Sequence, residues 1–592
     1  MPASAGLRWN DEWVGSRFPD RAPGCGIVRG VTGERSFLAG IVLLILAAGF
    51  VVCCGPEDRV AFLLYDDAYY YLGVARHIAA GAGSTFDGIN PTNGYHPLWC
   101  WLLLPIFLLA REPGTALRLA AGFWFLLAAA APLVLWRALR GRTGATGACL
   151  AAALFGLQPL LPPGLARPNG LETPLLAVCI GGFLIAWEKF WDRPGSVPPR
   201  HAGDSRHPEG RSAFLLGLVL GAVLLARLDA GLLAVAAAIL MAASLLPRLG
   251  LVASLQRLAL LTLGAVIVAG PSFVWNTMRF GHPMPVSGRI VRVYATLLRS
   301  GADPSLPEAS WIGHAAESMR SIALVFARSA VEGLPGAATL IRHGRILTGF
   351  LLIVLVGCFF LAVRFRRRGL TDPLFLLGVF AVLHAVAYAG WLWSPGETSY
   401  RLYYFLPLAM LVAASVGAAL GPVLEVAFAP SMRAFLAIAL LALAGGRIFP
   451  RQVAALPATE SGAGPVADRY IYGWVRRELP PDAVLGAPDA GKLGYFSGHP
   501  VVNLDGLAND QRFLHAVVTN TEDEYLLHSP IRFVLIDRPW LNGFDPSHSA
   551  TPPARRAGFG ETLYRLARRP GVQLRDVPGP PPDWVVVEIL RR

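Results

Sequence analysis

Long apolar runs separated by short polar loops occupy most of the first 450 residues of the chain. A helix needs about 20 apolar residues to cross the hydrocarbon core of a bilayer. Eleven runs of that order lie at 36–54, 115–136, 144–162, 173–190, 212–226, 229–247, 258–275, 345–363, 371–393, 402–421 and 432–449. The apolar segment 97–110 is shorter and is either a re-entrant or tilted helix or a further span. We therefore expect an all-α polytopic membrane domain with about 11–13 transmembrane helices.

The pattern changes near residue 450. A Gly/Ser/Pro/Ala-rich linker at 457–465 precedes a predicted amphipathic helix at 468–479. Short β-branched runs predict strands at 483–487, 501–504, 531–537 and 584–589. The segment 491–494 lacks the spacing of a nucleotide-binding loop and predicts a tight turn. Strands that alternate with helices predict a small α/β domain over 451–592, after a basic tail at 1–35 and the membrane domain at 36–450.

Composition supports this division. Hydrophobic residues make up 54% of the 592 residues and charged residues only 15%, whereas soluble proteins carry about 25% charged residues. The net charge of +13 comes from Lys and Arg in short loops rather than from one basic face, which argues against nucleic-acid binding. The chain is also rich in Ala, Gly, Arg and Pro, which is typical of proteins from GC-rich bacterial genomes.

The basic loops also predict orientation, because cytoplasmic loops of membrane proteins are enriched in Lys and Arg. The clusters lie at 137–142, 189–211, 248 and 364–368. With a cytoplasmic N-terminus, eleven spans put all four clusters inside, provided that the segment 97–110 does not cross the membrane. The loops 55–96 and 276–344 and the domain 451–592 are then extracytoplasmic, at the cell inner (plasma) membrane.

Candidate chemistry follows the first span directly, in the acidic pair Asp66 and Asp67. One interpretation is a helix cap, since carboxylates stabilise helix N-termini. The other is a general base whose pKa is raised by partial desolvation beside lipid. Glu172, in the next outward loop, is either a further site residue or the cap of the 173–190 helix.

These features together resemble a known family. The chain has an acidic pair after the first span, an aromatic-rich outer loop, a Pro97-Leu98-Trp99 start to the next apolar segment and a terminal outer domain. This combination resembles the GT-C membrane glycosyltransferases, such as protein mannosyltransferases, aminoarabinose transferases and mycobacterial arabinofuranosyltransferases. The Asp66-Asp67-Ala68-Tyr69 pattern with residues 83–86 is most similar to bacterial arabinosyl- and mannosyl-type members.

The resemblance implies an inverting transfer of sugar from a polyprenyl-phosphate donor to a hydroxyl of a glycan, lipid or protein acceptor. In that family the first acid of the pair is the base, which implies Asp66. The second outward acid, here Glu172, helps to hold the acceptor or a metal. Asp66 and Glu172 would bind a divalent ion if one takes part, and no other cofactor is expected.

The donor phosphate needs positively charged or hydrogen-bonding groups. The family often has a Lys at the start of the second apolar segment, where this chain has His96. The guanidinium of Arg401 is a planar group of N–H donors that suits phosphate, and its neighbours Tyr400 and Tyr404 would line an isoprenoid groove. The alternative is that the Arg401 side chain only snorkels to the lipid headgroups. Arg227 either joins the substrate site or forms an internal ion pair with Asp229.

The loop 276–344 is a candidate lid over the acceptor. Two other classes of function remain open, a transporter or flippase of lipid-linked sugars and a non-catalytic membrane scaffold. Transporters commonly have charges at the membrane midplane and repeated halves. In this chain the charges gather at one face and no repeat is evident, so the enzyme is favoured.

Overall fold

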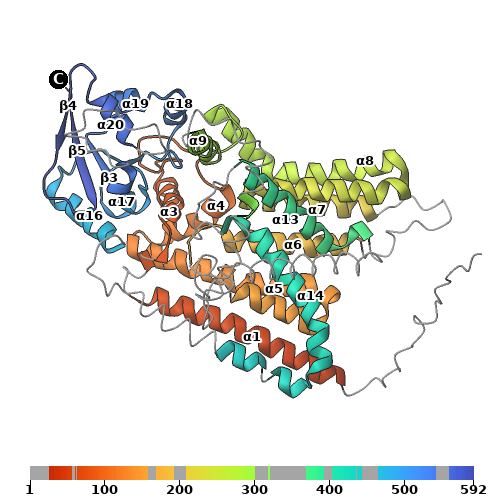
Figure 1. The fold of residues 1–592 in the computed structure, drawn as a ribbon. Coiled ribbons are helices and arrows are strands. Elements are labelled where there is room, and N and C mark those ends of the chain that lie inside the picture. The colour runs from red at the N-terminus through yellow and green to blue at the C-terminus, as the bar shows by residue number, and fades with distance from the viewer. Residues whose placement is uncertain are drawn as a thin grey trace, which may run out of the picture.

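The computed structural model describes residues 26–55, 60–61, 63–157, 168–191, 208–300, 318–320, 369–391, 403–434, 436–442, 465–541 and 559–591. The described chain forms a bundle of long helices with a small α/β domain at one end (Figure 1). The predicted span 345–363 and the end of the predicted span 432–449 lie outside the described residues.

Long apolar helices build the membrane domain. They are α1 (Gly26–Cys53), α5 (Pro113–Gly156), α6 (Thr173–Trp191), α7 (Pro208–Ala226), α8 (Gly231–Phe280), α13 (Pro373–Trp391) and α14 (Leu406–Ala427). Among the described residues, six segments are long and apolar enough to cross a membrane. The chain is a multi-pass membrane protein, as the sequence predicts.

Two helices contain more than one predicted span. A straight helix of 50 residues, the length of α8, would be about 75 Å long, far more than the bilayer core. A single glycine with a positive φ interrupts each of the two, Gly144 in α5 and Gly250 in α8, both at φ 74°. α5 contains the predicted run 115–136 and residues 144–156 of the run 144–162, and α8 contains residues 231–247 of the run 229–247 and the whole run 258–275. The short run 97–110 forms the 13-residue helix α4 (Pro97–Leu109).

Glycines allow the long helices to approach closely, as is common in membranes. A Cβ at Gly147 of α5 would lie 2.6 Å from the carbonyl oxygen of Gly417 in α14. Gly217 of α7 and Gly264 of α8 each face the backbone of the partner helix with no room for a Cβ. The bundle therefore packs backbone against backbone at these crossings.

The C-terminal domain is the predicted small α/β domain. Its strands are β1 (Leu485–Ala487), β2 (Val501–Asn503), β3 (Phe533–Asp537), β4 (Val572–Asp576) and β5 (Trp584–Arg591). Its helices are α16 (Pro465–Glu478), α17 (Gly491–Phe496), α18 (Gln511–Thr519), α19 (Glu522–His528) and α20 (Gly560–Leu566). The strand order is β2-β1-β3-β5-β4. β1 pairs in parallel with β2 and β3, and β5 pairs antiparallel with β3 and β4.

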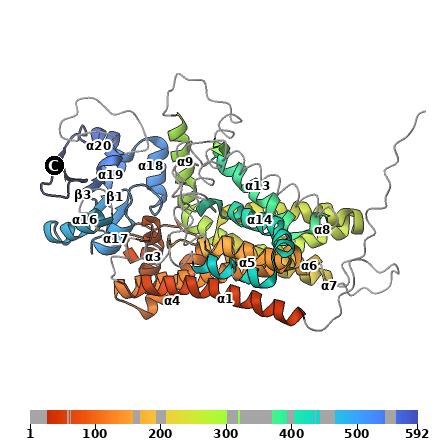
Figure 2. The same ribbon diagram turned by 60° about the horizontal axis from the view of Figure 1, so that its bottom comes forward.

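Two helices from the loops 55–96 and 276–344 lie between the bundle and this domain, namely α3 (Asp66–Ala79) and α9 (Val286–Ser300) (Figures 1 and 2). α9 lies near the start of the 276–344 loop and packs against the C-terminal domain. Its Val286 and Ile290 are buried in the same apolar cluster as Val502, Leu504 and Phe513. The loop, the first-loop helix α3 and the C-terminal domain thus meet at one end of the bundle.

Candidate functional site

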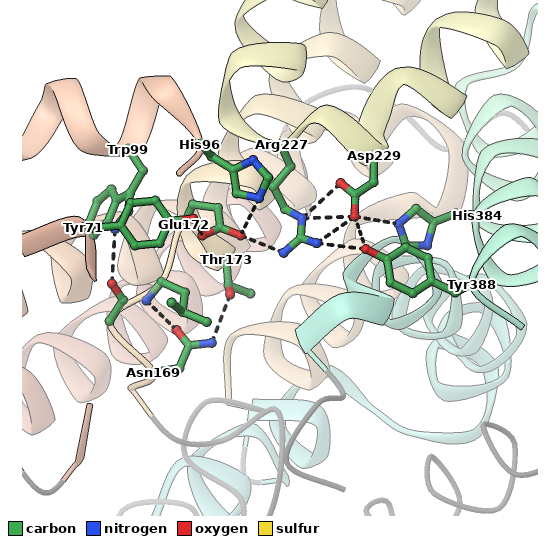
Figure 3. Close-up of polar contacts among 12 residues, drawn as sticks. Tyr71, His96, Trp99, Asn169, Glu172, Thr173, Arg227, Asp229, His384 and Tyr388 are labelled. Carbon is green, nitrogen blue, oxygen red and sulfur yellow. Dashed lines mark hydrogen bonds and ion pairs between the residues drawn. The ribbon is translucent and has the colours of Figure 1, made fainter. Parts of the chain in front are cut away.

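A buried cluster of charged side chains lies where α7 gives way to α8. Arg227 has an extended backbone there and is followed by a 3-10 turn, Leu228–Ala230. Its Nη1 donates to Oε1 of Glu172 at 2.7 Å, and its Nη2 donates to Oδ2 of Asp229 at 2.7 Å. The side chains of Arg227 and Glu172 are 5% and 2% exposed. One guanidinium therefore bridges two carboxylates that come from different parts of the chain (Figure 3).

Two further side chains, from the loop 55–96 that precedes α4, lie against Glu172. Tyr71, on α3, donates its hydroxyl to Oε2 of Glu172 at 3.0 Å. His96, which precedes α4, has its Nε2 3.7 Å from Oε1 of the same carboxylate. Burial lowers the pKa of His96, so this imidazole is neutral at pH 7. Glu172 is thus held by one cation and one hydroxyl, with a neutral ring beside it.

The far side of the cluster is aromatic. The hydroxyl of Tyr388 contacts Oδ2 of Asp229, and Nε2 of His384 lies 3.4 Å from the same oxygen. The guanidinium of Arg227 lies over the ring of Tyr404, 5.2 Å from its centroid. Tyr388 and His384 are spaced i, i+4 on α13 and point to the same partner (Figure 3). The sequence predicted Tyr404 as a site residue, whereas His384 and Tyr388 were missed.

The loop before α6 explains why Glu172 points into the bundle. Asn169 accepts the backbone N–H of Leu171 and donates to the hydroxyl of Thr173, each at 3.0 Å. The indoles of Trp99 and Trp124 donate to the carbonyl oxygens of Gly170 and Leu171, at 3.2 and 3.0 Å. The backbone of 169–171 is therefore fixed from several sides.

The acidic pair opens α3, and its first member contacts the C-terminal domain. The Asp66 oxygens accept the backbone N–H groups of Gly491 and Lys492 at 2.7 and 2.8 Å. Asp66 therefore caps a helix, but the helix is α17 and not α3. Burial raises the pKa of Asp66 well above its usual value, and the negative charge of nearby Asp489 raises it further.

The second member faces the charged cluster. Asp67 is half-buried and lies one helical turn before Tyr71, on the same face of α3. Its carboxylate acts electrostatically on the phenol of Tyr403. The Tyr403 ring lies 4.4 Å from that of Tyr404, which packs on Arg227. Asp67 is thus linked through two rings to the arginine that holds Glu172.

The remaining candidates divide as follows. Tyr400 and Arg401 lie outside the described residues, so the arginine grip on a donor phosphate stays a prediction. Within the described residues, no group of three or more His, Cys, Asp or Glu side chains is arranged to hold a metal ion. The suggested metal pair, Asp66 and Glu172, instead accepts hydrogen bonds from α17 on one side and from Arg227 and Tyr71 on the other.

Comparisons with known proteins address the fold. The C-terminal domain, over residues 462–586, matches a family model described as "Domain of unknown function (DUF8728)". A search of curated proteins gives no match to the sequence.

Solved structures match almost the whole chain. The apo crystal structure of ArnT from Cupriavidus metallidurans has a TM-score of 0.50 at 14% identity, and covers 94% of this chain and 98% of its own. ArnT bound to undecaprenyl phosphate has a TM-score of 0.47 at 13% identity, with 93% and 97% covered. Archaeal oligosaccharyltransferase AglB from Archaeoglobus fulgidus, in complex with an inhibitory peptide and a dolichol-phosphate, has a TM-score of 0.47 at 15% identity, with 85% and 69% covered. The resemblance seen in the sequence is confirmed at the level of the fold, and this chain has the GT-C fold shared with ArnT.

Proposed function

We propose that this chain is an integral-membrane glycosyltransferase that moves a sugar from a polyprenyl-phosphate donor to an acceptor hydroxyl, with inversion. The observation that carries the proposal is the double contact of α3, the helix that opens with the acidic pair: Tyr71 bonds Glu172 of the Arg227 cluster, and Asp66 bonds the C-terminal domain. Charged groups buried inside a membrane protein, such as Glu172, are costly and are retained mostly for function. The GT-C fold supports the same class.

The chemistry is one displacement at the anomeric carbon. A carboxylate of the pair removes the proton from the acceptor hydroxyl as its oxygen attacks that carbon. The bond from the anomeric carbon to the phosphate oxygen breaks, and the lipid phosphate leaves with the electron pair. Attack from the face opposite the leaving group inverts the configuration. No nucleotide is needed, because the sugar–phosphate bond already stores the energy.

Binding roles follow from charge and position. We assign the donor phosphate to Arg401, whose fork of donors suits it, with His96 as a neutral hydrogen-bonding group. Tyr400 and Tyr404 would line the groove for the isoprenoid chain. Arg227 already bonds two carboxylates, so we assign it to orienting Glu172 toward the acceptor. Asp66 and Glu172 are each held by protein donors, which does not fit a shared ion, and no proposed step passes through one.

We assign the site to the extracytoplasmic face of the inner membrane, with a cytoplasmic N-terminus. The support is a second ion cluster, formed by segments that adjoin the predicted inner loops. Arg142 pairs with Glu188, at the end of α6, at 3.3 Å, and with Asp372, just before α13, at 3.8 Å. Glu172 precedes the start of α6, so the two clusters lie beside opposite ends of that helix.

The test is complementation of a deletion strain, with the envelope glycans analysed by mass spectrometry. We expect the strain to lose a defined glycosyl mass, and the full chain to restore it. The double variant Asp66→Asn/Asp67→Asn and the single variant Glu172→Gln should fail, while Glu425→Gln, at an exposed position of α14, should succeed. Binding of undecaprenyl phosphate to the purified double variant should survive, because the carboxylates act on the acceptor.

Two outcomes would overturn the proposal. One is an unchanged glycan profile in the deletion strain, and the other is full restoration by the double variant. Accumulation of the lipid-linked sugar on the cytoplasmic side, with transfer intact in isolated membranes, would favour a flippase.

A further inference from the structure

The first two turns of α3 have two polar faces that serve different parts of the molecule. Residues four apart lie above each other on a helix, so Asp66 and Tyr70 share one face and Asp67 and Tyr71 share another. The first face contacts the C-terminal domain. The second faces the charged cluster around Arg227, where Tyr71 bonds Glu172.

The hydroxyl of Tyr70 makes three hydrogen bonds to the C-terminal domain. Its hydroxyl donates to Oδ2 of Asp505 at 2.9 Å and accepts from Nδ2 of Asn503 at 2.8 Å and from the backbone N–H of Ala490 at 3.1 Å. Strand β2 ends at Asn503, and β1 ends at Ala487, three residues before Ala490. The tyrosine therefore joins the carboxyl ends of two parallel strands to the first-loop helix.

Asp66 completes the contact one turn earlier. In parallel α/β sheets the carboxyl ends of the strands and the helix N-termini that follow them favour anionic groups. Here the group at the start of α17 is a carboxylate of the same chain, with one oxygen on each of two backbone N–H groups.

The two backbones also touch directly. A Cβ at Gly491 would overlap the backbone oxygen of Asp66, and a Cβ at Gly94 would overlap the carbonyl oxygen of Leu507. Thr92 donates its hydroxyl to the carbonyl oxygen of Asn509 at 2.8 Å. The domain therefore packs tightly on the first loop at several points along it.

We propose that the C-terminal domain is the positioning element of the active site, with Asp66 and Tyr70 as positioning residues. The base is then Asp67, in place of Asp66, which the resemblance implied. The proposal rests on the function proposed above and deepens it. By fixing the start of α3, the domain sets where Asp67 and Tyr71 lie relative to Glu172. Both Asp66 oxygens bind backbone N–H groups of the C-terminal domain, whereas Asp67 shares a face of α3 with Tyr71, which bonds Glu172.

The test compares conservative and truncating variants in the complementation assay, scored as the rate at which the lost glycan returns after induction. Asn keeps one of the two oxygens that accept the N–H groups of Gly491 and Lys492 but cannot act as a base. Asp66→Asn should therefore slow the reaction by less than about tenfold, whereas Asp67→Asn should slow it by about 10²–10⁴-fold, the usual contribution of a general base. Asp66→Ala, which removes the cap, should be slower than Asp66→Asn.

Hydrogen exchange of the purified full chain gives a second measurement that does not depend on activity. In Asp66→Ala the amides of Gly491 and Lys492 should exchange faster, while in Asp67→Ala they should keep wild-type protection. Unchanged exchange in Asp66→Ala would overturn the positioning role, even if the variant is inactive.

The outcomes separate this inference from the proposed function. If Asp66→Asn is inactive and Asp67→Asn is near wild type, the assignment of the base fails while the glycosyltransferase stands. If both single variants and the double variant restore the glycan fully, the proposed function itself fails. A Tyr70→Phe variant that matches the wild type in both measurements would also overturn the role of Tyr70.

Discussion

Replacing Glu172 by Ala tests whether the charged cluster holds the bundle together. The carboxylate joins the start of α6 to the α7–α8 connection through Arg227 and to α3 through Tyr71. Both ionic side chains are almost fully buried. The variant removes the negative charge and leaves the Tyr71 hydroxyl without this acceptor.

The magnitude follows from the geometry. Two unit charges about 4 Å apart attract by about 4 kcal/mol at an effective dielectric constant of about 20. Truncating one partner of a buried pair costs about 3–5 kcal/mol, mostly because the other charge stays buried. Asp229 still compensates Arg227 in the variant, so we expect the lower end, a loss of about 3 kcal/mol in the free energy of unfolding.

The measurement is an equilibrium SDS titration of the full chain in detergent micelles, followed by tryptophan fluorescence. The matched control is Glu425→Ala, an exposed carboxylate on α14, which should change the free energy by less than about 0.5 kcal/mol. A Glu172→Ala protein as stable as this control, or more stable than the wild type, would refute the reasoning. The cluster would then be a strained functional site rather than a structural link.

Three further predictions concern the helix crossings and the contact with the C-terminal domain. Gly147→Ala should lower the midpoint of thermal unfolding, because its Cβ would lie 2.6 Å from a carbonyl oxygen of α14, whereas Gly182→Ala, which has nothing within 4 Å, should leave it unchanged or raise it; equal effects would contradict the close crossing. Gly94→Ala should increase hydrogen exchange across 491–512, because its Cβ would overlap the backbone of the C-terminal domain, and unchanged exchange would rule out that contact. Burial and Asp489 raise the pKa of Asp66 in the folded protein, so its contribution to stability is fully present below the unfolded pKa of about 4 and is lost as pH rises through the higher folded pKa. Asp66→Asn removes this loss, and the difference in Tm, variant minus wild type, should grow as pH rises above about 4; a difference that is constant with pH would contradict the shift.

The fold could be predicted largely from the sequence because apolar length and β-branched runs report it directly. The predicted strands at 483–487, 501–504, 531–537 and 584–589 correspond to β1, β2, β3 and β5. β4 was missed because it is an edge strand whose residues are mostly exposed, and its sequence therefore has no apolar run.

The boundaries between spans were harder to predict. A glycine can stop a helix or merely bend it, and the hydropathy of Gly144 and Gly250 is the same in either case. The turn predicted at 491–494 is the first part of α17, because a six-residue helix is too short to show a helical period.

The site could be predicted by residue type but not by partner. Glu172, Arg227, His96 and Tyr404 are polar or aromatic groups beside apolar runs, and the structure brings all four together. The polar residues within the 371–393 run, His384 and Tyr388, carried a signal that could have been used, since such groups are rare in membrane helices. The contact of Asp66 with α17 spans 425 residues of sequence and leaves no local pattern to read.

Charge counting within the cluster limits where a donor phosphate can bind. Arg227 brings one positive charge to two carboxylates, Glu172 and Asp229, and its donors are directed to them and to the hydroxyl of Tyr388. His96 adds no charge at pH 7, because burial lowers its pKa. A phosphate placed directly against these two carboxylates would meet net negative charge in a medium that screens poorly, and His96 can offer it only a neutral hydrogen bond. The positive charge that the proposed donor needs must therefore come from another residue, which is the reason for assigning it to Arg401, while the cluster itself suits an uncharged hydroxyl acceptor.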